Sequence, residues 1–332
     1  MIDEVLAQPQ QIVDALWRVG AADIPRREHP GGLLVCGMGG SAIGGDLAAA
    51  AIGARAKRPV RTVRGYMIEP WLTPETLVLC ASYSGRTEET LACFEAAGEI
   101  GASRVALTTG GPLAARAREE GVPVIGVPSG MQPRAAVVYM TVGALECAAL
   151  CGASPPLRDE IEGAAPILEG VATDARSEVV AEALRDTLPV VHGAEATVAP
   201  ARRWKTQMNE NAKVAAFASE LPEANHNEIE GWRWAHDHAP MSAVFLTAET
   251  QSPRVARRLD LTAGLIEGQG VPVVRVAASG ETAVAQVLSL VMLGDLVSVR
   301  LAQLGAIDPE PVIYIEGFKD ALGRPADHAP KP

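Results

Sequence analysis

The sequence contains few cysteines and no concentration of positive charge. Five cysteines among 332 residues form no C-x-x-C pair, which argues against a disulfide framework and against a cysteine zinc site. We expect all five to be small core residues of a protein in a reducing compartment. Acidic residues outnumber basic ones by 40 to 29, and no basic run of five or six occurs. A nucleic-acid partner is therefore not expected.

The chain also lacks the pattern of an export signal. Its first residues, MIDEVLAQPQQ, are acidic where a signal peptide needs basic charge, so a cytoplasmic location is expected. The longest apolar stretch, Ala283 to Leu304, includes Asp295 and Arg300, which a lipid bilayer would disfavour. We predict that this stretch is a buried helix of a soluble core, and we expect no membrane partner.

Strand-like apolar runs alternate with helical segments in both halves of the chain. An N-terminal helix is predicted for Asp3 to Val19, and a long helix for Ala135 to Leu150. The pattern predicts an α/β protein with two subdomains, each a mostly parallel, doubly wound, flavodoxin-like sheet flanked by helices. The turn GASPP suggests domains at 1–152 and 153–332. The strand candidates are GLLVCG, RPVRTVRG, TLVLCAS, SRVALTT and VPVIGVPSG, followed by LPVVHGAE, APMSAVFLTAE and GVPVVRVAA.

A glycine-rich turn, LLVCGMGGSAIGGDLA at Leu33–Ala48, joins the first strand to a helix. Gly37, Gly39 and Ala42 fit the G-x-G-x-x-G/A pattern of a dinucleotide-binding loop. Such a loop requires an acidic residue about 20 positions later, at the end of the second strand. Here that strand ends in arginines, with no acidic residue before Glu69. The pattern disfavours an NAD site but leaves an NADP site open.

A phosphate is the other anion that these turns could bind. Gly40 and Ser41 lie where backbone amides and the helix dipole favour negative charge. The third strand runs into ASYSGRTEETL, which places Ser82, Ser84 and Thr87 at a second strand-to-helix turn. These hydroxyls could bind the terminal oxygens of a phosphate monoester, or could simply cap the helix. The pairing of the two turns at one sheet edge favours phosphate binding.

These motifs resemble a known family. GMGGSAIGGD and SYSGRTEET resemble the sugar isomerase (SIS) domain, and NENAKVAAFASELPEANHNEIEGW is similar to the bifunctional phosphoglucose/phosphomannose isomerases. MQPRAA and GAIDPEPVIYIEGFKDAL extend the resemblance along nearly the whole chain. It implies two SIS subdomains, cofactor-free and metal-independent aldose–ketose isomerisation of hexose 6-phosphates, and a homodimer with shared active sites. Arg86 departs from the family pattern, which has asparagine there.

The resemblance also implies roles for four residues. Glu210 would move a proton between C1 and C2 of the sugar, and His226, supplied by the partner chain, would help to open the sugar ring. Arg134 would stabilise negative charge on the enediolate, as a fixed guanidinium can. Lys319 would assist ring opening. Taken without the resemblance, Glu210 and Lys319 are ordinary surface residues of helices.

Alternatives remain from the residues themselves. His192, His236 and His238 compete with His226, and the H-x-D-x-H pattern of the last two suggests a metal site. Further ligands at suitable spacing are not evident, so no metal is expected. Two other functions are a non-catalytic SIS regulator that binds a sugar phosphate, and an NADP-dependent dehydrogenase. Such regulators usually carry a helix-turn-helix beside one SIS unit, whereas both halves here are predicted to be α/β.

Overall fold

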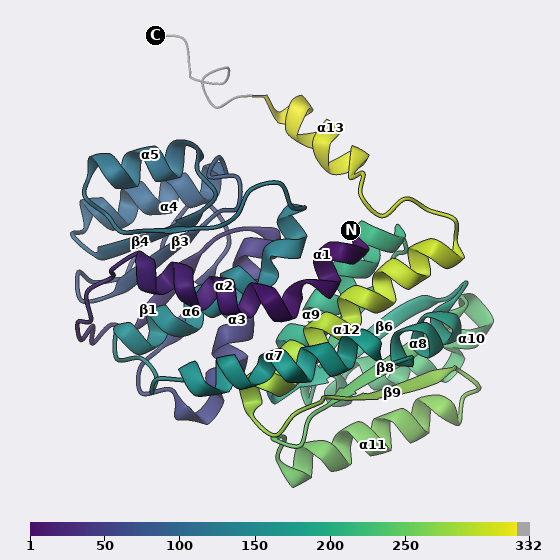
Figure 1. The fold of residues 1–332 in the computed structure, drawn as a ribbon. Helices are drawn as coiled ribbons and strands as arrows, with labels where there is room; N and C mark the ends of the chain where they lie inside the picture. The colour runs from purple at the N-terminus through teal and green to yellow at the C-terminus, as the bar shows by residue number, and fades with distance from the viewer. Residues whose placement is uncertain (324–332) are drawn as a thin grey trace.

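The computed structural model describes residues 1–323, so the last nine residues of the predicted second domain, 324–332, lie outside the described residues. Two separate parallel sheets organise the described chain (Figure 1). The first has the strand order β2-β1-β3-β4-β5, which is the flavodoxin-like order. Its strands are β1 (Leu33–Cys36), β2 (Val60–Val63), β3 (Leu77–Ala81), β4 (Ser103–Thr108) and β5 (Val124–Gly126).

The second sheet repeats this arrangement with four strands, in the order β7-β6-β8-β9, and every pair in both sheets is parallel. The predicted α/β class with two parallel sheets is confirmed. One strand, β7, was not predicted. The strands are β6 (Leu188–Ala194), β7 (Phe217–Leu221), β8 (Met241–Thr247) and β9 (Val273–Ala277).

Alternating side chains on the first sheet enter two different cores, as expected for a strand. Leu34 and Cys36 of β1 pack with helices α4 (Glu88–Glu99) and α5 (Gly111–Glu119) on one face. Leu33 and Val35 join a larger core on the other face. That core includes side chains from both halves of the chain. The predicted boundary between residues 152 and 153 therefore divides two sheets that share one core, and the boundary itself stays a prediction.

Helices from both halves contribute to the shared core, and α12 runs through the middle of the molecule (Figure 1). Trp204, whose Nε1 donates to the Leu290 carbonyl at 2.7 Å, packs against this helix. The contributing helices are α1 (Ile2–Leu6), α2 (Gln8–Ala21), α3 (Gly39–Ile52), α6 (Val137–Leu150), α7 (Arg158–Thr173), α8 (Arg176–Leu184), α9 (Val198–Gln207) and α12 (Ala283–Leu304).

Two segments, Pro133–Leu150 and Ala283–Leu304, are long and apolar enough to span a membrane by length and composition. Of the most apolar 18 residues in each segment, 78% and 94% are buried inside the protein, so both segments belong to the core. The prediction of a buried helix for Ala283 to Leu304 is confirmed. All five cysteines are free and buried, as predicted.

At the two ends of the described chain, the N-terminal helix is divided in two and the last helix lies outside the core. The N-terminal helix is divided at Ala7 into α1 (Ile2–Leu6) and α2, because Pro9 is accommodated only in the first turn of a helix. At the other end, α13 (Ile313–Leu322) projects from the body (Figure 1). None of its residues is buried, and Tyr314 is 94% exposed.

Candidate active site

Hydroxyl groups meet at the carboxyl ends of β1 and β3, which are neighbouring strands. Ser41 lies in the first turn of α3, and its Oγ accepts a hydrogen bond from the Tyr83 amide at 3.2 Å. Ser82 and Thr87 join their hydroxyls at 2.8 Å. Thr87 occupies the N-cap position of α4 but makes no side-chain capping bond. Its hydroxyl therefore faces the loop, so the capping interpretation does not hold for this residue.

The loop after β3 depends on a glycine. Gly85 has φ +63°, and a Cβ on it would lie 1.9 Å from the Gly110 carbonyl oxygen. Only glycine lets this loop fold so closely against its neighbour. Ser84 remains exposed beside it, where its Oγ accepts from the Arg86 amide at 3.2 Å. Arg86 is exposed as well. The loop thus presents the Ser84 hydroxyl to solvent near the N-termini of α3 and α4. Such a position favours the binding of an anion.

Arg134 lies directly against the first of these turns. A Cβ on Gly40 would be 3.3 Å from both Arg134 Cα and the Pro133 carbonyl oxygen. Arg134 belongs to the short helix η2 (Pro133–Ala136) after β5, and is only 4% exposed. Burial lowers the pKa of its guanidinium, while the charge of Glu210 raises it. A guanidinium stays protonated in proteins even so, which gives the site a fixed positive charge.

Four oxygen atoms hold the Arg134 guanidinium. Nε donates to Asn211 Oδ1 at 2.6 Å, and one terminal nitrogen donates to Gln132 Oε1 at 3.2 Å. The other terminal nitrogen donates to the carbonyl oxygens of Pro309 and Glu310, at 2.7 and 3.0 Å. Arg134 therefore connects the first sheet to the segment before β7 and to the segment that leads into α13.

Glu210 occupies a π-helical turn, η4 (Met208–Ala212), which extends α9. Such turns recur at functional sites because they redirect side chains. Two asparagines fix this turn: Asn209 donates to the Val214 carbonyl at 2.8 Å, and Asn211 binds Arg134. Between them the Glu210 side chain is half-buried. The arrangement places a carboxylate close enough to Arg134 to raise the pKa of its guanidinium.

Lys213 lies beside Glu210 and was not among the residues predicted from the sequence. It ends the π-helical turn with φ +58°, in the left-handed region. Its Nζ donates to the Pro309 carbonyl at 3.2 Å and also contacts the Glu210 carbonyl. Burial and Arg134 lower the pKa of Lys213. The NENAK motif contained the signal, since this lysine follows Glu210 by three residues.

His226 lies at the other end of β7 from Glu210. It is the last residue of the short helix η5 (Glu223–His226), and it is exposed. Its neighbours are anchored: Asn225 Nδ2 donates to Thr262 Oγ1 at 2.8 Å, and Asn227 Nδ2 donates to Glu223 Oε1 at 2.8 Å. Five strand residues separate the two segments and span about 16 Å. Among the described residues, no hydrogen bond or ion pair joins Glu210 to His226.

The remaining candidates lie elsewhere. His192 is buried on β6, where its ring stacks on Phe245 with centroids 4.5 Å apart. Burial lowers its pKa to about 4, so it is neutral at ordinary pH. His238 is exposed, and the side chain of His236 lies outside the described part of the structure. Lys319 is exposed on the projecting helix α13.

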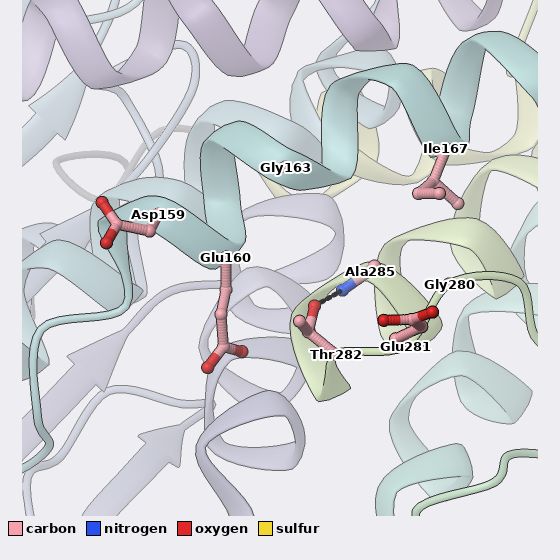
Figure 2. Close-up of a pocket in the computed structure, with 8 residues that line it drawn as sticks. All are labelled: Asp159, Glu160, Gly163, Ile167, Gly280, Glu281, Thr282 and Ala285. Atoms are coloured by element: carbon pink, nitrogen blue, oxygen red, sulfur yellow. Dashed lines mark hydrogen bonds between the residues drawn. The ribbon is translucent and has the colours of Figure 1, made fainter.

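No group of three or more metal-ligating side chains is present among the described residues. A surface hollow lies between α7 and the N-terminus of α12, and Figure 2 shows its acidic side chains Asp159, Glu160 and Glu281. Glu160 pairs with Arg55. None of the residues that line the hollow is a candidate site residue. It is separate from the edge where hydroxyls, Arg134 and Glu210 are gathered.

The gathered residues provide the parts that a proton transfer on a phosphorylated substrate needs. Gly40, Ser41, Ser82 and Thr87, the predicted phosphate-binding residues, lie at one sheet edge with Ser84 exposed beside them, and Arg134 links that edge to the turn that carries Glu210. A carboxylate can act as a general base, and a fixed guanidinium can stabilise a developing oxyanion.

Comparisons with known proteins agree with this arrangement. Residues 173–322 match the model of the bacterial phospho-glucose isomerase C-terminal SIS domain. The solved structure of a tagatose-6-phosphate ketose/aldose isomerase from Escherichia coli superposes with a TM-score of 0.74 at 15% identity, covering 94% of this chain and 95% of that one. At that identity the likeness shows the fold alone.

Two curated relatives are closer in sequence, and both are named bifunctional phosphoglucose/phosphomannose isomerase. The protein from Caldicellulosiruptor bescii is 34% identical, covering 98% of this chain and 100% of its own length. The protein from Aquifex aeolicus is 36% identical, covering 89% of this chain and 91% of its own. With this identity over nearly the full length of both relatives, the chain belongs to the bifunctional phosphoglucose/phosphomannose isomerase family.

Proposed function

We propose that this chain is an isomerase that interconverts glucose 6-phosphate with fructose 6-phosphate, and mannose 6-phosphate with fructose 6-phosphate. The observation that carries the proposal is the position of Glu210. Its turn is joined through Asn211 to Arg134, which packs on the glycine-rich turn of the hydroxyl loops. A carboxylate, a fixed cation and a group of hydroxyls are thus linked in a chain whose relatives carry these activities in their names, which supports the proposal.

In the proposed reaction, the Glu210 carboxylate takes the proton from C2 of the open-chain aldose. The C2–H electrons form the C1–C2 double bond, and the carbonyl electrons move to O1 as an enediolate, which Arg134 stabilises. Glu210 then returns the proton to C1. The O2 hydroxyl loses its proton and O1 gains one, which gives the ketose. Atoms and charge balance, and no redox partner is needed.

The same intermediate accounts for two aldose substrates. Glucose and mannose phosphates differ only in configuration at C2, and that difference vanishes when C2 becomes part of the planar enediolate. The 6-phosphate would bind Gly40, Ser41, Ser82, Ser84 and Thr87, so the reacting carbons lie at the other end of the sugar. Binding of the unreactive phosphate can then position C1 and C2 beside Glu210.

The proposal includes a homodimer with shared sites. His226 and Glu210 flank opposite ends of β7, which supports a site that combines Glu210 of one chain with His226 of its partner. The helix α13 is amphipathic but has no buried residue, and it exposes Tyr314 and Phe318 (68%). Exposed apolar side chains on one helix are typical of a surface that another chain covers. Lys319, on the same helix, would reach a site only in such an assembly.

Coupled assays with glucose, mannose and fructose 6-phosphates, with EDTA present, test this function. We expect both isomerase activities without a metal, a cofactor or a nucleic acid, in a cytoplasmic homodimer. Activity that vanished with EDTA and returned with zinc would contradict the proposal. Tight binding of fructose 6-phosphate without turnover would favour a non-catalytic regulator instead. Strong thermal stabilisation by NADP, with none by fructose 6-phosphate, would favour a dehydrogenase.

A further inference from the structure

A charged residue, Asp295, lies in the middle of the most apolar helix of the protein. It is fully buried on α12, and its carboxylate receives two hydrogen bonds from Arg203, each 2.9 Å long. Gln8 Nε2 adds a third at 2.9 Å. Arg203 is itself only 1% exposed. A buried ion pair of this kind adds little net stability, because desolvation offsets the attraction. Its presence in an apolar helix therefore points to a specific role.

One arm of hydrogen bonds runs from this ion pair to the main chain of Arg134. Arg203 uses one terminal nitrogen both for Asp295 and for the Arg134 carbonyl oxygen, at 2.6 Å. The Arg134 backbone is also the surface against which Gly40 packs. The ion pair thus fixes the main chain of η2 at Arg134.

A second arm runs from the backbone of Asp295 to the guanidinium of Arg134. Ser298 donates its hydroxyl proton to the Asp295 carbonyl at 2.7 Å, so its oxygen is free to accept. Asn211 Nδ2 donates to that oxygen at 2.9 Å, and Asn211 Oδ1 accepts from Arg134 Nε at 2.6 Å. Because Ser298 can only accept here, the Asn211 amide has one orientation, with its oxygen toward Arg134.

The two arms close a ring that begins and ends at Asp295, and all of its members are buried. We propose that Asp295 is a positioning residue for the isomerisation, holding Arg134 by its backbone and its guanidinium while Asn211 ties the Glu210 turn to the same ring. The inference rests on the proposed function. The ring contacts the proposed phosphate-binding loops only where Gly40 packs on the Arg134 backbone, and it includes no hydroxyl of those loops. We therefore expect its main effect at the reacting end of the substrate.

Replacing Asp295 itself is a poor test, because Asp295→Asn leaves the buried Arg203 without its counter-charge and can unfold the chain. Ser298→Ala is gentler, and α12 contains a matched control in Ser289. Both serines are buried, and each donates to a carbonyl three residues earlier. Ser289 accepts from the Ser279 amide at 2.9 Å and lies outside the ring.

We expect Ser298→Ala to lower kcat about tenfold or more with KM nearly unchanged, because small misplacements of catalytic groups are costly. Ser289→Ala should lose similar stability and keep its kcat. Nitrogen NMR gives a second measurement that does not depend on turnover. The Nε–H signal of Arg134, identified by its loss in Arg134→Lys, should be protected from exchange in the wild type and in Ser289→Ala, and unprotected in Ser298→Ala.

Equal kcat values in the two serine variants, measured where both are folded, would overturn the inference, as would an unprotected Arg134 Nε–H in the wild type. A wild type that turned over none of the three hexose phosphates, yet kept a protected Nε–H, would overturn the proposed function. The positioning role in isomerisation would fall with it, although the ring itself would stand.

Discussion

Asn211 Oδ1 accepts a hydrogen bond from Arg134 Nε at 2.6 Å, across 77 positions of sequence. Arg134 follows the last strand of the first sheet, and Asn211 precedes the edge strand of the second. This contact ties the two halves of the molecule together next to Glu210. Both side chains are buried, so the contact is shielded from competition with water. The relative position of the two sheets therefore sets the relative position of the guanidinium and the carboxylate.

Replacing Glu210 by glutamine removes the proposed base while keeping the shape of the side chain. We expect kcat to fall by roughly 10² to 10⁴, the usual contribution of general acid–base catalysis. Sugar-phosphate affinity should be largely kept, as measured by calorimetry. Glu220→Gln is the control, since that exposed glutamate on β7 pairs with Arg202 at 3.1 Å and should be replaceable without loss. A Glu210→Gln enzyme that still exchanged the C2 proton with solvent would rule out the mechanism.

Mixing two inactive variants tests the shared site. Glu210→Gln and His226→Asn homodimers should each be nearly inactive, whereas a mixed dimer contains one site with both native residues. We expect activity to reappear as subunits exchange, and native mass spectrometry can follow that exchange. If mixed dimers formed and activity stayed absent, the shared-site arrangement would be wrong.

The exposed hydroxyl of Ser84 is expected to contribute binding energy that does not change during the reaction. Ser84→Ala should raise KM about tenfold, as expected for a lost hydrogen bond to a charged group, with a much smaller effect on kcat. Ser103→Ala is the control, because Ser103 begins β4 at the opposite end of the same sheet. An unchanged KM in the double variant Ser82→Ala/Ser84→Ala would place the phosphate elsewhere.

His192 should make the fold sensitive to acid. Its pKa is lowered to about 4 by burial, from an ordinary value of 6.5, so the unfolded chain binds the proton more readily. Stability should therefore fall as pH drops from about 6.5 toward 4, by at most about 3 kcal/mol. His192→Phe should flatten this dependence in denaturant titrations at several pH values. Some slope should remain, since burial also lowers the pKa of His29. An unaltered slope would contradict the assignment.

The sequence was sufficient for most of the architecture because β1, β3 and β8 are almost wholly buried and read as continuous apolar runs. The strand β7 was missed for the opposite reason. Only Ser219 and Leu221 are buried in FASEL, since it is an edge strand with one neighbour. Its short mixture of polar and apolar residues has no strong periodicity, so it could not be told from a loop.

The candidate site could be proposed from the sequence only where its residues are close together in the chain. Ser82, Ser84 and Thr87 lie in one turn, and their pairing with Ser41 follows from adjacent parallel strands. The ring around Asp295 joins residues from four separate elements, and no local pattern marks such contacts. Asp295 was recognised as unsuited to a membrane, but its partner Arg203 lies 92 residues away. Contacts of this kind depend on how α12 packs between the two halves.

The Arg134 guanidinium also holds the main chain at Pro309 and Glu310, just before α13. Lysine offers a point charge without the planar fork, so Arg134→Lys would keep the charge and lose several of these bonds. The attachment of the segment before α13 would then weaken, and the proposed stabilisation of the enediolate by Arg134 would weaken with it. Protease cleavage within residues 305–312 would report the first effect, and kcat the second. An activity loss at this position is therefore a sum of two defects, and limited proteolysis is the means to separate them.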